Sequence, residues 1–138
     1  MQTIGYEICQ SARKVYQHLD NLFSEFDVTP EQWVIIKCLL QKEGISQKEL
    51  SIAVKKDQNT TKAIVDKLTD KGYIHRVGNP MDRRAFILTL TPKAKEIAPK
   101  LAKLDSQMIE TLKSGISEGE LESFYQTLKK IQENLRLD

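Results

Sequence analysis

The stretch from Ser46 to Thr91 most constrains the fold of this chain, because two helical patterns in it are followed directly by a hairpin pattern. Ser46 and Glu49 have the spacing of a capping box, in which each side chain bonds a free backbone N–H at a helix start. Apolar residues that follow fall on one face of the expected helix: Leu50, Ala53 and Val54.

A second helix is predicted from about Gln58 to Lys71, with Asp57 as its N-cap. Its apolar residues recur at helical spacing: Ala63, Ile64 and Leu68, with Val65 beside them. Gly72 follows, as is usual for the left-handed position just past a helix end. Two helices joined by a tight turn, the second beginning with small polar residues, are typical of a helix-turn-helix that reads the major groove of DNA.

Two short β-prone runs come next, and the segment between them is basic and rich in turn residues: Tyr73 to Val77, Phe86 to Leu90, and Gly78 to Arg84 between them. A hairpin after a helix-turn-helix is a wing, whose tip can insert an Arg into a narrow minor groove. Asp82 stands two places before Arg84. We therefore expect the Asp82 carboxylate to hold the Arg84 guanidinium through a bidentate pair.

Side chains at the start of the second helix suit base recognition, because Gln and Asn pair with adenine and Thr bonds a base or touches a thymine methyl. We predict base contacts from four of them: Gln58, Asn59, Thr60 and Thr61. Phosphate contacts are expected from Lys48, Lys55, Lys56, Lys62, Lys67, Arg76 and Arg83. The predicted DNA-binding set is Ser46, Gln47, Gln58, Asn59, Thr60, Thr61, Lys62, Lys67, Arg76, Asp82, Arg83 and Arg84. The alternative is a solvated helix turn and a charged loop that only keeps the hairpin soluble.

The distribution of charge supports a nucleic-acid footprint. Residues 46–93 hold ten Lys or Arg and five Asp or Glu, a surplus of five positive charges within a chain of net charge +2. The flanking residues are therefore acidic overall. Positive charge gathered on one segment is typical of phosphate binding, although a Lys-rich solvated face gives the same pattern.

At these residues the chain resembles a known family. The helix-turn-helix, then KLTDKGYIHR, then NPMDRRAFILTLT, is similar to the multiple-antibiotic-resistance regulator (MarR) family of bacterial transcription factors. The specific part is the D-x-R wing signature before a strand that ends L-T-L-T. The resemblance implies a winged-helix homodimer that binds pseudo-palindromic double-stranded DNA and responds to a small molecule. It also implies a wing pair at Asp82 and Arg84, and a recognition helix that contains Gln58 to Lys62.

The flanking sequence predicts long amphipathic helices. One helix spans 3–26, and a second begins at Thr29 and Pro30, whose capping box is completed by Gln32. A third begins at Thr91 and runs to about Ser114, with Pro99 bending or dividing it, and Ser117 caps a last helix. We expect a mainly α fold with a small antiparallel β-wing: a winged helix-turn-helix lobe at 30–91, and dimerisation helices at 1–29 and 92–138 of a single chain, 1–138.

Several classes are disfavoured by the sequence. No apolar run reaches the roughly 18 residues of a membrane span, and no signal-peptide pattern opens the chain, so a cytoplasmic protein is expected. No catalytic, cofactor-binding or metal-ligand motif occurs, so we expect neither an enzyme nor a bound cofactor or metal. Two alternatives stay open: redox sensing through Cys9, and a winged-helix protein-interaction module that does not bind DNA.

Overall fold

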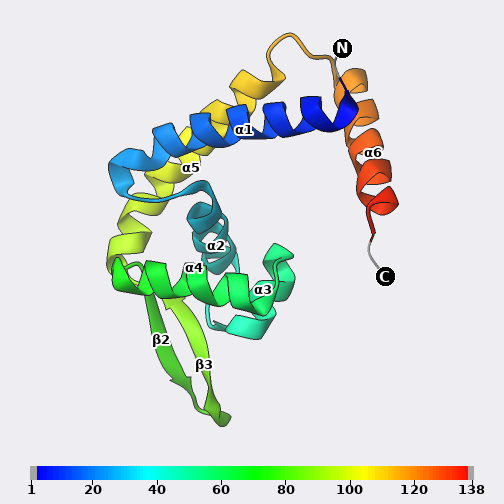
Figure 1. The fold of residues 1–138 in the computed structure, drawn as a ribbon. Coiled ribbons are helices and arrows are strands. Elements are labelled where there is room, and N and C mark those ends of the chain that lie inside the picture. The colour runs from blue at the N-terminus through cyan, green and yellow to red at the C-terminus, as the bar shows by residue number, and fades with distance from the viewer. Residues whose placement is uncertain (1–2, 137–138) are drawn as a thin grey trace. The chain divides into compact units, whose positions relative to one another are not determined.

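The computed structural model describes residues 3–136, which form six α-helices, one 3-10 turn and a three-stranded antiparallel sheet (Figure 1). The elements are α1 (Ile4–Phe23), η1 (Ser24–Phe26), α2 (Pro30–Gln41), β1 (Ile45–Ser46), α3 (Gln47–Val54), α4 (Gln58–Asp70), β2 (Ile74–Asn79), β3 (Asp82–Leu90), α5 (Pro92–Lys113) and α6 (Glu118–Asn134). The predicted winged-helix fold is confirmed. The chain divides into two compact units, Met1–Leu104 and Asp105–Asp138.

Short polar caps fix where the helices start. The two predicted capping boxes are present, Thr29 with Gln32 and Ser46 with Glu49, and the predicted cap Ser117 forms a third box with Glu120. At α3, for example, the Ser46 hydroxyl accepts the Glu49 N–H at 3.1 Å, and the Glu49 carboxylate accepts the Ser46 N–H at 3.3 Å. Each box satisfies two backbone donors that the helix itself leaves free. Local sequence alone therefore sets these three boundaries.

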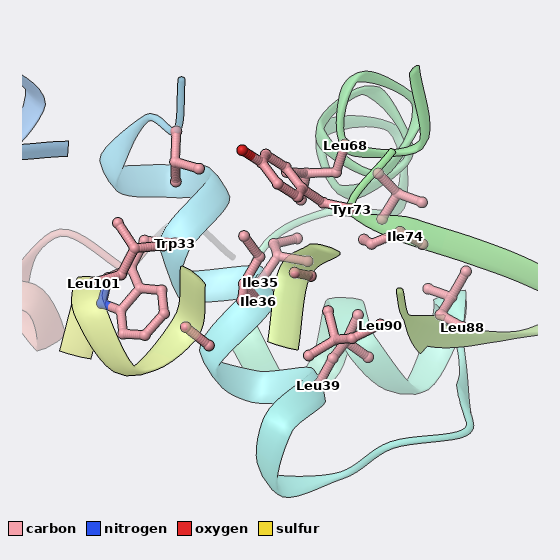
Figure 2. Packing of buried hydrophobic residues seen from close by; sticks show 14 of the residues in the cluster. Trp33, Ile35, Ile36, Leu39, Leu68, Tyr73, Ile74, Leu88, Leu90 and Leu101 are labelled. Atoms are coloured by element: carbon pink, nitrogen blue, oxygen red, sulfur yellow. The ribbon is translucent and has the colours of Figure 1, made fainter. Parts of the chain in front are cut away.

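The core of the first unit is built around α2. Its fully buried side chains meet residues from α4, the wing and α5, as Figure 2 shows: Ile35, Ile36, Leu39, Leu68, Ile74, Leu88, Leu90 and Leu101. Burying one such side chain contributes about 1.5–3 kcal/mol relative to leaving it exposed. Most apolar side chains of α2 are buried, but Val34 and Leu40 stay 43% and 45% exposed.

The sheet has the strand order β1-β3-β2, so β3 is its central strand. In the brief β1, Ile45 pairs with Leu88, and Ile74 at the root of β2 pairs with Leu90. The ladder becomes irregular between Gly78 and Asn79, near the turn. Beyond the root, β2 and β3 project as a two-stranded hairpin away from α2 and α4 (Figure 1).

Three details differ from the sequence expectations. Ala53 and Ala63 were placed on buried helix faces, yet both are exposed. α5 continues through Pro99 as one helix, so the proline does not divide it. A single proline removes one backbone donor and leaves the hydrogen bonds of the neighbouring turns in place.

The second unit contains the end of α5 and all of α6. No described residue of α6 is buried, although the helix carries the predicted apolar stripe. Phe124 and Tyr125 are more than half exposed, and their rings lie 6.2 Å apart. Among residues 3–136, no helix is long and apolar enough to cross a bilayer.

Candidate nucleic-acid interface

The turn between α3 and α4 is held by its own side chains and backbone. Lys55 ends α3 in the left-handed conformation at φ 57°, and Asp57 is the N-cap of α4, as predicted. The Asp57 carboxylate accepts the Thr60 N–H at 2.7 Å and the Thr60 hydroxyl at 2.8 Å. The backbone bond first, and the hydroxyl bond second, hold the pKa of Asp57 below its usual value. The first turn of α4 is therefore ordered around an ionised carboxylate.

The polar side chains of this first turn fall into two groups. Gln58, Asn59 and Thr60 are exposed, as base recognition requires. The Thr60 hydroxyl already donates its hydrogen bond to Asp57, so only the oxygen is left to act as an acceptor. Thr61, in contrast, is fully buried.

Thr61 departs from its predicted place at the surface. Its hydroxyl donates to the backbone oxygen of Asp57 at 2.9 Å, the carbonyl that also accepts the Thr61 N–H at 3.0 Å. It lies on the same helix face as the buried Val65 and Leu68, four and seven residues on. Thr61 thus has a structural part in this conformation, with no atom open to a base.

The predicted phosphate-binding cations also differ in whether they form ion pairs within the protein. Lys62 and Arg76 both form ion pairs with Asp66. The Lys62 Nζ lies 2.9 Å from Asp66 Oδ2. Lys67 and Arg83 are exposed. The Lys62 and Arg76 charges are therefore already partly offset within the protein.

Two carboxylate or amide side chains shape the wing tip. Asn79 Oδ1 accepts the Met81 N–H at 2.9 Å, and Asp82 Oδ1 accepts the Arg84 N–H at 2.9 Å. The expected pair between the Asp82 carboxylate and the Arg84 guanidinium is not found among the described residues, because the backbone N–H two places on lies within easier reach. Asp82 orders the turn and leaves the Arg84 side chain exposed.

A groove of about 360 Å³ lies between the start of α3 and the inner face of the wing. Its lining residues are Ser46, Gln47, Lys48, Arg76, Arg84, Ala85, Phe86 and Leu88. The fold thus brings together four predicted site residues from three separate parts of the sequence: Ser46, Gln47, Arg76 and Arg84. Three cationic side chains around one groove favour binding of an anion such as a backbone phosphate.

Sequence reasoning missed two features of this region. Asp66 carries no motif signal, and its spacing of four from Lys62 was the only sign that it would form an ion pair. Met81 is 91% exposed at the wing tip, and Phe86 is 56% exposed in the groove. Exposed apolar side chains beside exposed arginines are a feature that only the hairpin geometry reveals.

The two cysteines and the buried aromatic pair of the core lie on elements outside the groove lining. Cys9 is exposed on α1, whereas Cys38 is partly buried against the core. Trp33 and Phe23 are buried with ring centroids 6.2 Å apart, so these two aromatics are core residues.

Comparison with known proteins places the chain in a family. Residues 28–86, which contain α2 to the wing tip, match the family model described as "MarR family". The chain is 25% identical over 138 residues to the uncharacterised HTH-type transcriptional regulator YybA of Bacillus subtilis, covering all of this chain and 92% of that one. It is 29% identical over 130 residues to the multiple antibiotic resistance protein MarR of Salmonella typhimurium, covering 93% and 90% of the two chains.

A solved structure has the same fold along nearly the whole chain. The S. aureus MepR–DNA complex superposes with a TM-score of 0.86 at 24% identity, covering 97% of each chain. The YybA relative is named as a transcriptional regulator, which agrees with the prediction that the chain is not an enzyme. Residues 28–86 are thus a MarR-family winged helix-turn-helix region, within a chain whose relatives of similar length include the MarR protein itself.

Proposed function

We propose that this chain is a repressor that binds pseudo-palindromic promoter DNA as a homodimer, and that a small-molecule ligand modulates its DNA affinity. One observation carries the proposal: an exposed polar helix start and a basic wing occur together in one compact unit, with a cationic groove at the wing. A helix-turn-helix directs such a helix start at base edges, and a wing Arg suits a narrow minor groove. The similar MepR fold was solved with DNA bound.

We assign the contacts by exposure. Gln58, Asn59 and Thr60 would read bases in the major groove, and Arg84 would enter the minor groove. Phosphate contacts would come from the exposed cations, the half-buried Lys56 and the start of α3: Ser46, Gln47, Lys48, Lys55, Lys56, Lys67 and Arg83. Lys62 and Arg76 contribute only to the extent that Asp66 releases them. Asp82 orders the tip, and the buried Thr61 is left out of the contacts.

The homodimer is supported by apolar surface that the described chain leaves uncovered. Phe124 and Tyr125 on α6, and Ile4 and Tyr6 on α1, are all more than half exposed. Large exposed apolar side chains that share one helix are typical of protein–protein interfaces. We therefore retain 30–91 as the DNA-binding lobe and 1–29 with 92–138 as the dimerisation region. A two-fold dimer would place two lobes on half-sites about one DNA turn apart.

Ligand control then requires a difference in affinity between two arrangements of the dimer. A small molecule lowers DNA binding only if it binds a non-binding arrangement more tightly than the DNA-bound one. A regulator of transcription works where the chromosome is, so the proposal includes a cytoplasmic location.

The test is selection of duplexes from a random pool by the purified full chain at fixed salt, with sedimentation analysis of the same sample. We expect a two-fold symmetric consensus, a dimer, and an affinity that falls steeply with salt because phosphate contacts release counterions. A monomer with no preference among sequences would end the proposal. Weak binding to any duplex with a shallow salt dependence would favour the protein-interaction module instead.

A further inference from the structure

Asp66, in the middle of α4, lies between two cations from different elements. Its Oδ2 accepts from the Lys62 Nζ at 2.9 Å, one turn earlier on the same helix. Its Oδ1 accepts from the Arg76 Nη2 on β2. Both carboxylate oxygens are thus engaged, one with Lys62 of α4, the predicted reading helix, and the other with Arg76 of the wing. The hydrogen bonds from Lys62 first and Arg76 second hold the pKa of Asp66 below its usual value, so the carboxylate is ionised near neutral pH.

These bonds connect the two parts of the candidate interface. Arg76 pairs with Leu88 across the β2–β3 ladder, and both residues line the groove at the start of α3. Holding the Arg76 guanidinium against α4 therefore fixes the inner face of the wing relative to the reading helix. The three side chains are 62%, 40% and 29% exposed for Lys62, Asp66 and Arg76. Ion pairs with this much solvent contact add little to stability, so the arrangement needs another explanation.

We propose that Asp66 is a positioning residue that determines DNA specificity, which rests on the proposed function above. It fixes the position of the wing relative to α4. It also keeps Lys62 and Arg76 from binding the phosphates of any duplex regardless of sequence. Free Lys and Arg side chains strengthen binding to any DNA, because phosphate contacts carry no sequence information. A tethered Arg76 contributes only where the wing and the helix fit together.

The test compares Asp66→Asn with Asp70→Asn, its matched control. Asp70 lies one turn further on the same helix, is exposed, and forms no ion pair among the described residues. Both variants remove one negative charge, but only Asp66→Asn releases Lys62 and Arg76. Affinity is measured for a duplex selected from a random pool and for a shuffled duplex of the same composition, at several salt concentrations.

We expect Asp66→Asn to bind the shuffled duplex more tightly than wild type, with a salt slope steeper by about 1–2 because up to two phosphate contacts are added. Its preference for the selected duplex should fall by about tenfold, while Asp70→Asn stays within about twofold of wild type. An equal change in both variants would mean that net charge alone acts. Unchanged preference in Asp66→Asn, or increased preference, would also overturn the proposal.

Hydrogen exchange of the DNA-free protein separates this inference from the proposed function. If Asp66 positions the wing, amides of β2 and β3 exchange faster in Asp66→Asn than in wild type or Asp70→Asn. Equal exchange in all three proteins would refute the positioning part. If the wild-type chain selects no duplex at all, the proposed function fails, and the specificity proposal falls with it even where exchange shows the tether.

Discussion

Replacing the buried hydroxyl of Thr61 tests whether this side chain supports the structure of α4 or contacts DNA. Thr61→Val keeps the shape of the side chain and replaces only the hydroxyl with a methyl group. That hydroxyl donates to the Asp57 backbone oxygen at 2.9 Å, and the same oxygen accepts the Thr61 N–H at 3.0 Å. After the substitution the carbonyl keeps its backbone donor, so no buried polar group is left without a partner.

The expected effect on stability follows from these contacts. A net hydrogen bond contributes about 0.5–1.5 kcal/mol, and the low end applies because the acceptor stays bonded. Thr61 is 0% exposed, so the added methyl group is buried and stabilises the folded state by about 0.8 kcal/mol. The free energy of unfolding should therefore change by less than about 1 kcal/mol. DNA affinity should stay within about twofold of wild type, whereas loss of a base contact costs about 1–3 kcal/mol, or about 5- to 150-fold.

The assay is fluorescence anisotropy on a duplex selected from a random pool, at one salt concentration, with urea unfolding of the same samples. Gln58→Ala, from the same helix turn, is the matched variant and should lose about 1–3 kcal/mol of discrimination between sites. Suppose Thr61→Val loses tenfold or more in affinity while unfolding at the same urea concentration. The hydroxyl would then face DNA in the complex, and our interpretation of its burial would be refuted.

Three further predictions test the wing, the core and the helix cap. Arg84→Ala should reduce the salt slope of DNA binding by about 1 without changing helix content by circular dichroism; an unchanged slope would remove Arg84 from the interface. Leu68→Ala should lower the free energy of unfolding by about 2–5 kcal/mol in urea, because a fully buried side chain leaves a cavity. The lowered pKa of Asp57 means that its contribution to stability is present above the usual Asp range near pH 4 and is lost as pH falls through the folded value. The melting temperature should thus fall less between pH 5 and pH 2 in Asp57→Asn than in wild type, and parallel curves would contradict this.

Features decided over a few residues could be predicted from sequence. The caps at Thr29, Ser46, Asp57 and Ser117 are all where the pattern puts them, because a side chain and a backbone N–H three residues apart need no tertiary contact. The hairpin and its turn follow equally local rules. These elements, in their order, were sufficient to predict the fold.

Burial within a helix was less predictable. Ala63 was assigned to the buried face and Thr61 to the surface, and their places are reversed. Periodicity treats Thr as polar, yet a Thr hydroxyl can satisfy itself on the carbonyl one turn back and then be buried like Val. The spacing from Thr61 to Val65 and Leu68 carried this information, but residue type hid it.

Contacts between distant segments could not be inferred at all. The Asp66–Arg76 pair depends on how β2 leaves the end of α4, and the groove at the start of α3 depends on the register of β3. Neither is fixed by spacing in one chain. Residue type and local pattern were therefore enough to select candidate site residues, whereas the contacts among those residues could be known only from the three-dimensional fold.

The root of the wing constrains how a ligand could regulate this lobe. Lys71 donates to the Asp27 carbonyl at 2.8 Å and to Gln32 Oε1 at 2.9 Å, and the Tyr73 hydroxyl donates to the Phe26 carbonyl at 2.6 Å. These bonds tie the turn between α4 and β2 to the segment that precedes α2 and to the first turn of α2 itself. Asp66 also joins α4 to Arg76 on β2. Two separate sets of bonds therefore hold the wing in place, one at its root and one between α4 and β2. A ligand that altered the wing alone would have to break both, so we expect regulation to move the lobe as one body and to change the spacing of two lobes in the dimer.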